Sequence, residues 1–289
     1  MPMSARLLRP RSTGFHPDAQ DWRNRVITNG GTVSGSTLTA VSNFCRSIDA
    51  AGIRDRFYRL NLFAGDNLNA ALVPLYRAES HTASIRGNTT DTNNNFVSGD
   101  FNNTGSSSGL KADGTSKYLN TGLSANAVTA SNAHLGVGLR ATESRSAAFR
   151  TVIGTYGGTS FTTNSLEIAV HGTNSRTGSA FFTRFGTTSD CAGDNIGGAT
   201  GALATGDIVA AWPSMYRNGS ATGATATTST NYPAAHSIYV FANNNGGASV
   251  INYTDARVSW YSIGLTMTAA QALSFYNAIA AFNTALSRT

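Results

Sequence analysis

Carboxylates that could cleave a glycosidic bond are scarce in this sequence. It contains three glutamates, Glu79, Glu143 and Glu167, and none has an acidic neighbour two or four residues away. Glycoside hydrolases use two carboxylates that flank the bond at a separation of roughly 5 to 9.5 Å. Asp190 and Asp194 form the nearest acidic pair, but "SDCAGDN" is typical of a loop. We therefore predict no catalytic residues and expect that the chain is not an enzyme.

Other site chemistries also lack their motifs. There is no GxSxG elbow for a nucleophilic serine, and "GLKADGTSK" lacks the order of a phosphate-binding loop. Cys45 and Cys191 form no CxxC pair, so we predict neither a disulfide framework nor a zinc site. The run Asp91 to Asn95 offers oxygen ligands without the Gly and terminal Glu of a calcium loop. We predict no metal and no cofactor, with Ca²⁺ held between loops as the alternative.

Sugar binding fits the available residues better. Glycan sites use aromatic faces and planar amides on loops. The candidates, all near the ends of predicted strands, are Trp212, Tyr216, Tyr232, Asn243, Asn244 and Asn245. The alternative interpretation is that Trp212 belongs to the core and that the asparagines only turn the chain.

The elements that would position these residues are mostly short strands. Charged residues make up only 12% of the chain, about half the usual fraction, and Gly, Ser, Thr and Asn are abundant. From about Ala78 onward, segments rich in β-branched and aromatic residues alternate with turn residues; they include "KYLNTGL", "AHLGVGLR", "FRTVIGTY", "SLEIAVH", "DIVAAW", "SIYVFAN" and "ARVSWYSIG". Asn218-Gly219 is the signature of a type I′ hairpin turn. Many short strands at this spacing predict a sandwich or a barrel.

Helices are expected at both ends of this β region. Pro17 suits the first turn of a helix that ends at Gly30, and a second helix ends at Gly52. Residues 53–74 also remain compatible with a helix. Near the C-terminus, "TAAQ" at Thr268 to Gln271 has the spacing of a capping box, and the apolar stripe that follows predicts a docked helix over residues 269–287.

The first residues of the chain are basic. Residues 1–60 hold nine Arg against four Asp, and Arg6, Arg9 and Arg11 precede the first acid. Such a tail is suited to anchoring on an acidic surface, or it is simply a flexible terminus. The chain contains only two Lys, so nucleic acid is not the expected partner. No apolar run is long enough to cross a bilayer, so we expect no membrane contact.

Several motifs resemble those of concanavalin A-like (laminin-G-like) jelly rolls found in virion proteins of tailed phages and prophages. They are "FVSGDF" with "GLKADGTSKYLNTGL", "SMYRNGS", "IYVFANNNGG" and the ending "VSWYSIGLTMTAAQALSFYNAIAAF". The segment "NGGTVSGSTLTAVSNFCRSIDAAGIRDRFYRLNLFAGDNLNAALVPL" resembles the helical region that precedes such jelly rolls.

This resemblance implies a mainly β fold: a concanavalin A-like jelly-roll β-sandwich with an N-terminal helical segment and a C-terminal helix. We expect a basic flexible tail over 1–16, a helical segment over 17–77 and the jelly roll over 78–289. The implied function is a non-enzymatic structural or adhesive component of a tail fibre, a baseplate or a head surface. It would lie in the virion, after assembly in the host cytoplasm.

The implied partners are other virion proteins, further copies of the chain in a homo-oligomer, and host-surface polysaccharide. Arg6, Arg9 and Arg11 would anchor the chain in the particle. The alternatives are a free carbohydrate-binding module similar to a lectin, and a jelly-roll glycoside hydrolase. Within residues 96–123, we expect Phe96, Val97, Tyr118 and Leu123 to point into the core.

Overall fold

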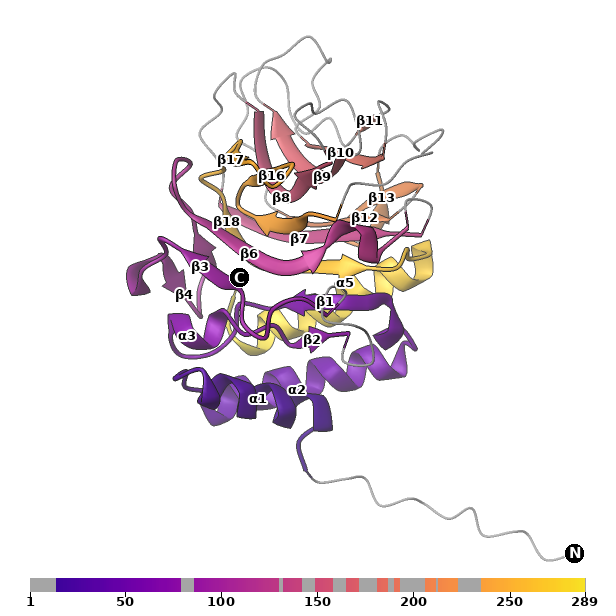
Figure 1. The fold of residues 1–289 in the computed structure, drawn as a ribbon. Coiled ribbons are helices and arrows are strands. Elements are labelled where there is room, and N and C mark those ends of the chain that lie inside the picture. Colours follow the sequence, from indigo (N-terminus) through magenta and orange to yellow (C-terminus); the bar gives the residue numbers. More distant parts are fainter. Residues whose placement is uncertain are drawn as a thin grey trace, which may run out of the picture.

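The structure is a computed structural model in which sheets and helices are layered on one another (Figure 1). It describes residues 14–78, 86–129, 132–141, 149–157, 165–171, 181–186, 190–192, 206–211, 213–222 and 235–288. The helices are α1 (Pro17–Thr28), α2 (Gly35–Ala50), α3 (Leu68–Ala71) and α5 (Ala269–Ala285). Short 3₁₀ turns cover Arg54–Arg56, Ser98–Asp100 and Ala125–Ala127. None of the described helices is long and apolar enough to span a membrane.

The described strands form two sheets of nine strands each. Sheet A has the order β14 (Ser220–Ala221), β13 (Ser214–Arg217), β12 (Gly206–Ala211), β7 (His134–Ala141), β18 (Arg257–Gly264), β1 (Phe57–Asn61) and β2 (Tyr76–Arg77), with β5 (Gly109–Lys111) against β18 and β4 (Phe101–Asn102) against β5. Sheet B has the order β11 (Asp190–Ala192), β10 (Phe181–Gly186), β9 (Ser165–His171), β8 (Phe149–Tyr156), β15 (Ser237–Val240), β6 (Tyr118–Ser124) and β3 (Thr92–Asn94), with β16 (Asn243–Asn245) against β8 and β17 (Ser249–Ile251) against β16. Among the described pairs, only β16 with β8 is parallel. The prediction of a mainly β fold is confirmed.

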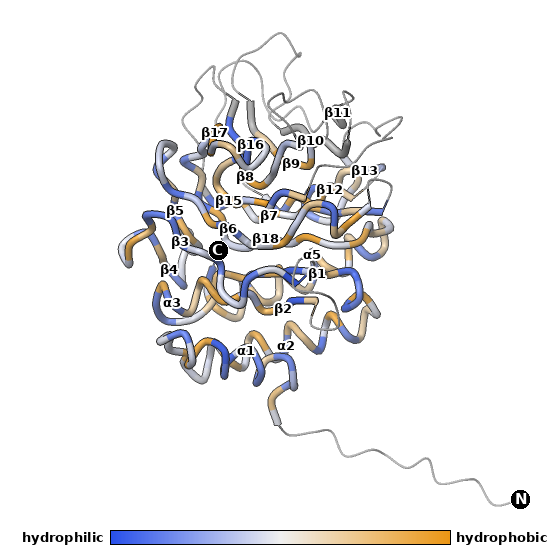
Figure 2. The backbone as a smooth tube through the Cα atoms, in the orientation of Figure 1, coloured by the Kyte–Doolittle hydropathy of each residue, from blue (hydrophilic) through white to orange (hydrophobic). Residues whose placement is uncertain are grey.

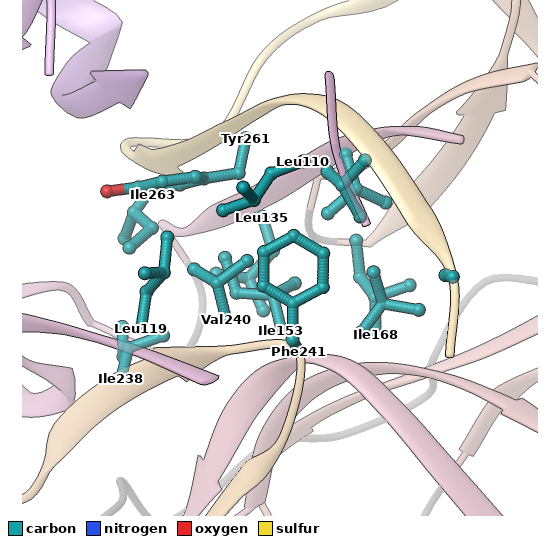
Figure 3. Close-up of a cluster of buried hydrophobic side chains, with 14 of the residues drawn as sticks. Leu110, Leu119, Leu135, Ile153, Ile168, Ile238, Val240, Phe241, Tyr261 and Ile263 are labelled. Atoms are coloured by element: carbon teal, nitrogen blue, oxygen red, sulfur yellow. The ribbon is translucent and has the colours of Figure 1, made fainter. Parts of the chain in front are cut away.

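The two sheets share one apolar core. Leu135, Tyr261 and Ile263 of sheet A lie across from Leu119 and Val240 of sheet B (Figure 3). On β6, for example, Leu119 and Leu123 point into this core and the residues between them alternate, which is the pattern expected of a strand with one buried face. The opposite face of each sheet therefore meets either another layer or solvent.

A second core lies between sheet A and the helices. Trp22 of α1, Phe44 of α2 and Phe275 of α5 are buried there together with Trp260 of β18. Along α1 and α2, apolar and polar residues alternate (Figure 2), so that each helix buries one side and exposes the other. The helical layer covers the outer face of sheet A, and sheet B has no such layer among the described residues.

The predicted helix ends are largely confirmed. Pro17 is the first residue of α1, and Gly30 and Gly52 adopt the positive φ angles of 72° and 64° that follow α1 and α2. The capping box at the start of α5 is present, with Thr268 and Gln271 bonded reciprocally. The helix ends at Ala285, slightly before the predicted end at residue 287.

The segment 17–77 is not entirely helical as predicted. Residues 57–61 form β1, which pairs with β18 and β2 in sheet A. Phe57 and Leu60 belong to the core between sheet A and the helices. The three-residue spacing of these apolar positions fits a helix and also fits a strand with a bulge, and the register of β1 against β18 does shift between Phe57 and Arg59. Residues 57–61 form a strand because they pair with β18 and β2.

Candidate functional site

The predicted glycan-binding asparagines lie in β16, and two of them are buried. Asn243 donates from Nδ2 to Glu167 Oε2 at 3.1 Å, and Asn244 donates from Nδ2 to the Ser237 carbonyl at 2.8 Å. Asn245 is partly exposed and donates to Ser249 Oγ. The amides of Asn243 and Asn244 thus hold β16 in place and do not face a ligand in this structure.

The aromatic candidates are separated from these asparagines. Tyr216 is 6% exposed and belongs to the core between sheet A and the helices. Trp212, Tyr232 and the proposed anchoring residues Arg6, Arg9 and Arg11 lie outside the described residues. The structure therefore does not bring Tyr216 and the asparagines into one site.

Three other tyrosines form a cluster on the outer face of sheet B. Tyr118 of β6 and Tyr239 of β15 are stacked, with ring centroids 4.9 Å apart and an interplanar angle of 29°. Tyr253, which follows β17, meets Tyr118 edge-on at 6.1 Å. All three side chains are partly exposed. We call Tyr118, Tyr239 and Tyr253 the tyrosine platform.

The alternation of β6 explains why the platform faces outward. Leu119 and Leu123 belong to the core between the sheets, so Tyr118 and Asn120 must lie on the opposite face. Across the sheet, Asn120 pairs with Tyr239 of β15 and with Thr92 of β3, and Tyr118 pairs with Asn94 of β3. Amide and hydroxyl side chains therefore border the tyrosine rings on the same face.

The prediction that Tyr118 points into the core is wrong, and so is the same prediction for Val97, which is 61% exposed. Phe96 and Leu123 are buried as predicted. Tyr118 is one residue from Leu119, so the two cannot share a face of the strand. Val97 directly follows the buried Phe96 and precedes a 3₁₀ turn, which carries its side chain to solvent.

The hydroxyls of the platform lie close enough to affect one another. Burial, and then the neighbouring hydroxyl of Tyr118, raises the pKa of both Tyr239 and Tyr253 above the usual tyrosine value. These two hydroxyls therefore stay protonated at neutral pH. Among the described residues, none of the three platform hydroxyls has a hydrogen-bond partner, so all three are available to donate to a ligand and to accept from it.

The charged groups next to the platform are compensated within the protein. Burial raises the pKa of Asp113, but hydrogen bonds from Ser116, Thr115 and Lys117 outweigh it and hold the pKa well below its usual range. The Lys117 ammonium binds both carboxylate oxygens of Asp100 at 2.7 Å. The platform is thus an aromatic and amide surface whose neighbouring charges are paired or hydrogen-bonded.

Glu167 lies in the same row of sheet B as Tyr239, with Gly154 of β8 between them. Its carboxylate is buried and accepts hydrogen bonds from Thr151 Oγ1 and from Asn243 Nδ2, each at 3.1 Å. Glu167 is therefore a buried member of a hydrogen-bond network beside the platform. Of the other acids considered as catalytic groups, Asp190 belongs to β11 and not to a loop, and Glu79, Glu143 and Asp194 lie outside the described residues.

The oxygen atoms of Asp91, the first residue of the predicted calcium-ligand run, are engaged with protein donors. One oxygen accepts from Arg59 and Tyr261, and the other accepts from Asn61. Within the part of the chain that the structure describes, no three His, Cys, Asp or Glu side chains gather as ligands of one metal ion.

The prediction from the sequence placed a sugar on loop residues and missed the platform. The signal that could have found it is the alternation in "KYLNTGL" and "SIYV", where one aromatic residue stands on the face opposite to two aliphatic ones. Tyr253 has no such signal, because it reaches the platform from a loop.

No family model and no curated protein matches the chain. Similar solved structures include a Trypanosoma rangeli sialidase in complex with sialic acid, at a TM-score of 0.46 and 9% identity over 83% of this chain and 38% of that one. A mutant of the NanB sialidase from Streptococcus pneumoniae gives a TM-score of 0.37 at 12% identity over 55% of this chain and 26% of that one. The CBM40 of a Ruminococcus gnavus IT-sialidase gives 0.39 at 11% identity over 55% of this chain and 91% of that one.

These comparisons correct one prediction. Sialidases are enzymes, so the expectation that this chain is not an enzyme is contradicted and is withdrawn. TM-scores between 0.37 and 0.46 assign no activity to this chain. The chain spans 26% and 38% of the length of the two sialidase chains described above.

Proposed function

We propose that this protein binds a neutral carbohydrate chain on the outer face of sheet B, with the tyrosine platform as its binding surface. The observation that carries the proposal is the stacked pair Tyr118 and Tyr239, partly exposed and bordered by amides. We expect a neutral ligand because the charged groups near the platform, Asp113, Lys117 and Asp100, already bind protein partners and so leave no charge for an ionic ligand to pair with.

The physical basis is the dual character of a sugar ring and of a tyrosine. A sugar offers apolar C–H faces and polar hydroxyl edges, and tyrosine offers an apolar ring with a polar tip. The ring faces would lie under the sugar, while the tyrosine hydroxyls and the amides of Asn94 and Asn120 would meet its edges. If one sugar covers about 50 Å² of the Tyr239 ring, the burial contributes about 1.2 kcal/mol, or about eightfold in affinity.

We further propose that the two sheets form a concanavalin A-like jelly roll and that the protein works as an adhesive component of a phage-like particle. The support is the shared core of the two mostly antiparallel sheets together with the sequence resemblance to virion jelly rolls. In a homo-oligomer or on a particle surface, several weak sugar sites would act together and gain affinity through avidity. A free carbohydrate-binding module is the alternative.

A glycan array followed by titration calorimetry tests the binding site. We expect neutral glycans to bind, and Tyr239→Ala and Tyr118→Ala each to lower the affinity by about fivefold to tenfold. Phe15→Ala is the matched control, since Phe15 is an aromatic residue just before α1, 41% exposed, and should leave the affinity unchanged. Binding that is equally strong in all three variants would exclude the platform.

A separate experiment tests the particle. Deleting residues 1–15 removes Arg6, Arg9 and Arg11, and we expect incorporation into particles to fall while glycan binding is retained. Unchanged incorporation would contradict the anchoring role, and an absence of the protein from any particle would favour the free module.

A further inference from the structure

A polar hollow lies on the other side of the molecule from the outer face of sheet B, where β7 and β12 meet the C-terminal helix. Its volume is about 430 Å³, within the size range of small-molecule sites. The lining includes Arg140, Asp207, Asn218, Tyr276, Asn283 and Arg288. Four separate parts of the chain supply these residues: β7, the β12–β14 hairpin region, α5 and the segment after α5.

Arg140 and Asp207 form an oriented ion pair at one wall. Arg140 Nη2 lies 2.8 Å from Asp207 Oδ1, and Trp260 Nε1 donates to the same oxygen at 2.8 Å. Arg140 uses one other donor, to the Leu139 carbonyl. Because a guanidinium has five N–H donors, three remain without a partner among the described residues. Asp207 Oδ2 likewise has none.

Arg288 adds a second cation at this hollow. The residue is 2% exposed, and its guanidinium donates to the carbonyls of Leu62, Phe63 and Asn103 and to the side-chain oxygen of Asn103, at 2.6 to 2.9 Å. No carboxylate accepts from it within the described residues. Burial, and then the positive charge of Arg140, lowers the pKa of Arg288 to about 9. The hollow therefore has two guanidinium groups and one carboxylate, and its net charge is positive.

The remaining polar groups at the hollow, from Asn283 and Asn218, are suited to hydrogen bonds with hydroxyl groups of a ligand. Asn283 of α5 is 7% exposed, and its Oδ1 is a buried acceptor without a partner. Asn218 accepts from the Asp207 amide through Oδ1 at 2.9 Å, which fixes its side chain and leaves Nδ2 as a donor toward the hollow. An isolated anion such as chloride would satisfy the cations and leave the buried Asn283 Oδ1 unpaired, which is costly.

We propose that this hollow binds a hydroxylated organic carboxylate, of the class of a uronic acid. Its carboxylate would meet the spare N–H groups of Arg140, which favour planar anions. Its hydroxyls would donate to Asn283 Oδ1 and to Asp207 Oδ2, and its ring would lie beside Tyr276. The site is separate from the tyrosine platform and does not depend on it.

Titration calorimetry on the full chain at pH 7 and low salt tests this site, with D-glucuronate as the probe and with glucose and acetate as comparison ligands. We expect one glucuronate per chain, with glucose and acetate each bound at least about tenfold more weakly, because each lacks half of the recognised groups. Arg140→Gln should weaken glucuronate by about tenfold or more, since it removes a charge-assisted contact.

Asn283→Leu is the second variant, which keeps the side-chain volume and removes the unpaired acceptor; we expect it to weaken glucuronate as well. Circular dichroism checks the fold of both variants, and the glucuronate-induced shift in melting temperature of the unmodified chain reports binding without any variant. Phe15→Ala, outside the hollow and the platform, is the control and should leave glucuronate binding unchanged. The proposal is overturned by the absence of saturable glucuronate binding, by unchanged binding in both variants, or by acetate binding as tightly as glucuronate.

Discussion

Replacing Asp91 by alanine should be among the most destabilising single changes in this protein. The Asp91 carboxylate and the Arg59 guanidinium are fully buried and lie 2.7 Å apart. The same carboxylate accepts from Arg59 Nε at 3.1 Å, from the Tyr261 hydroxyl at 2.6 Å and from Asn61 Nδ2 at 2.8 Å. Asp91→Ala removes this shared acceptor, so that Arg59 Nη2 and the Tyr261 hydroxyl lose their carboxylate partner, while Arg59 Nε keeps the Tyr261 oxygen and Asn61 Nδ2 keeps the Ala71 carbonyl.

The expected cost follows from what is left behind. The Arg59 charge would stay buried without a carboxylate partner, with the carbonyls of Arg86 and Asn88 as acceptors for Nη1 and the Tyr261 oxygen as the acceptor for Nε. Breaking a buried ion pair by removing one partner costs about 3 to 5 kcal/mol. The double variant Arg59→Met with Asp91→Leu removes both charges, and such replacements often change the free energy of unfolding only slightly. We therefore expect the double variant to lose less stability than Asp91→Ala alone.

Urea unfolding followed by circular dichroism measures the free energies. The two single variants and the double variant form a thermodynamic cycle, and we expect a coupling energy of at least about 2 kcal/mol between Arg59 and Asp91. A loss of less than about 1 kcal/mol for Asp91→Ala would refute the reasoning, since it would mean that the buried guanidinium finds other compensation. Asp91 directly precedes β3, so the variant should also loosen the edge of sheet B next to Tyr118.

Two further predictions concern pH and backbone conformation. Burial lowers the pKa of His134 to about 4, against the opposing effect of its hydrogen bond to the Leu265 carbonyl. In the unfolded chain His134 is protonated near pH 6.5, whereas in the folded chain it stays neutral at that pH. The contribution of the neutral His134 to the free energy of unfolding is therefore fully present above pH 6.5, and the free energy of unfolding falls by about 2.5 kcal/mol between pH 7 and 4.5. Urea unfolding at both pH values should show a smaller fall in His134→Gln. Gly219 has a φ of 77°, and an added Cβ would lie 3.0 Å from Tyr276, so Gly219→Ala should cost about 1 to 2 kcal/mol in thermal unfolding. Gly35→Ala, where a Cβ meets nothing within 4 Å, should be neutral or slightly stabilising.

Local signals in the sequence predicted the local structure well. Asn218 and Gly219 both have positive φ, 49° and 77°, and join β13 to β14 as the Asn-Gly pair predicts. The capping box at Thr268 and the buried stripe of Phe275, Ile279 and Phe282 are equally local. Each depends on residues that are close together along the chain, so no knowledge of the fold was needed.

Features that depend on distant pairing were not predictable in this way. The polar hollow joins Arg140 to Asn283 and Arg288, which lie far away along the chain. The burial of Asn243 depends on Glu167, a residue of another strand. A run of asparagines indicates a turn or a loop, and only the contacts of Asn243 with Glu167 and of Asn244 with the Ser237 carbonyl show that the first two amides are buried.

The position of the tyrosine platform was partly predictable, because the face on which Tyr118 lies follows from the alternation of side chains along the single strand β6. Leu123 lies five positions after Tyr118, an odd offset, so a regular strand places the two side chains on opposite faces. A prediction that both point inward was therefore inconsistent with the strand that contained them. Leu119, Thr121 and Leu123 share one face, and Thr121 can be buried there because its hydroxyl donates to the Ile238 carbonyl at 2.7 Å. Once these aliphatic and hydroxyl positions are assigned to the core, Tyr118 and Asn120 remain on the outer face as an aromatic ring and a nearby amide, which is the pairing that a sugar ring requires.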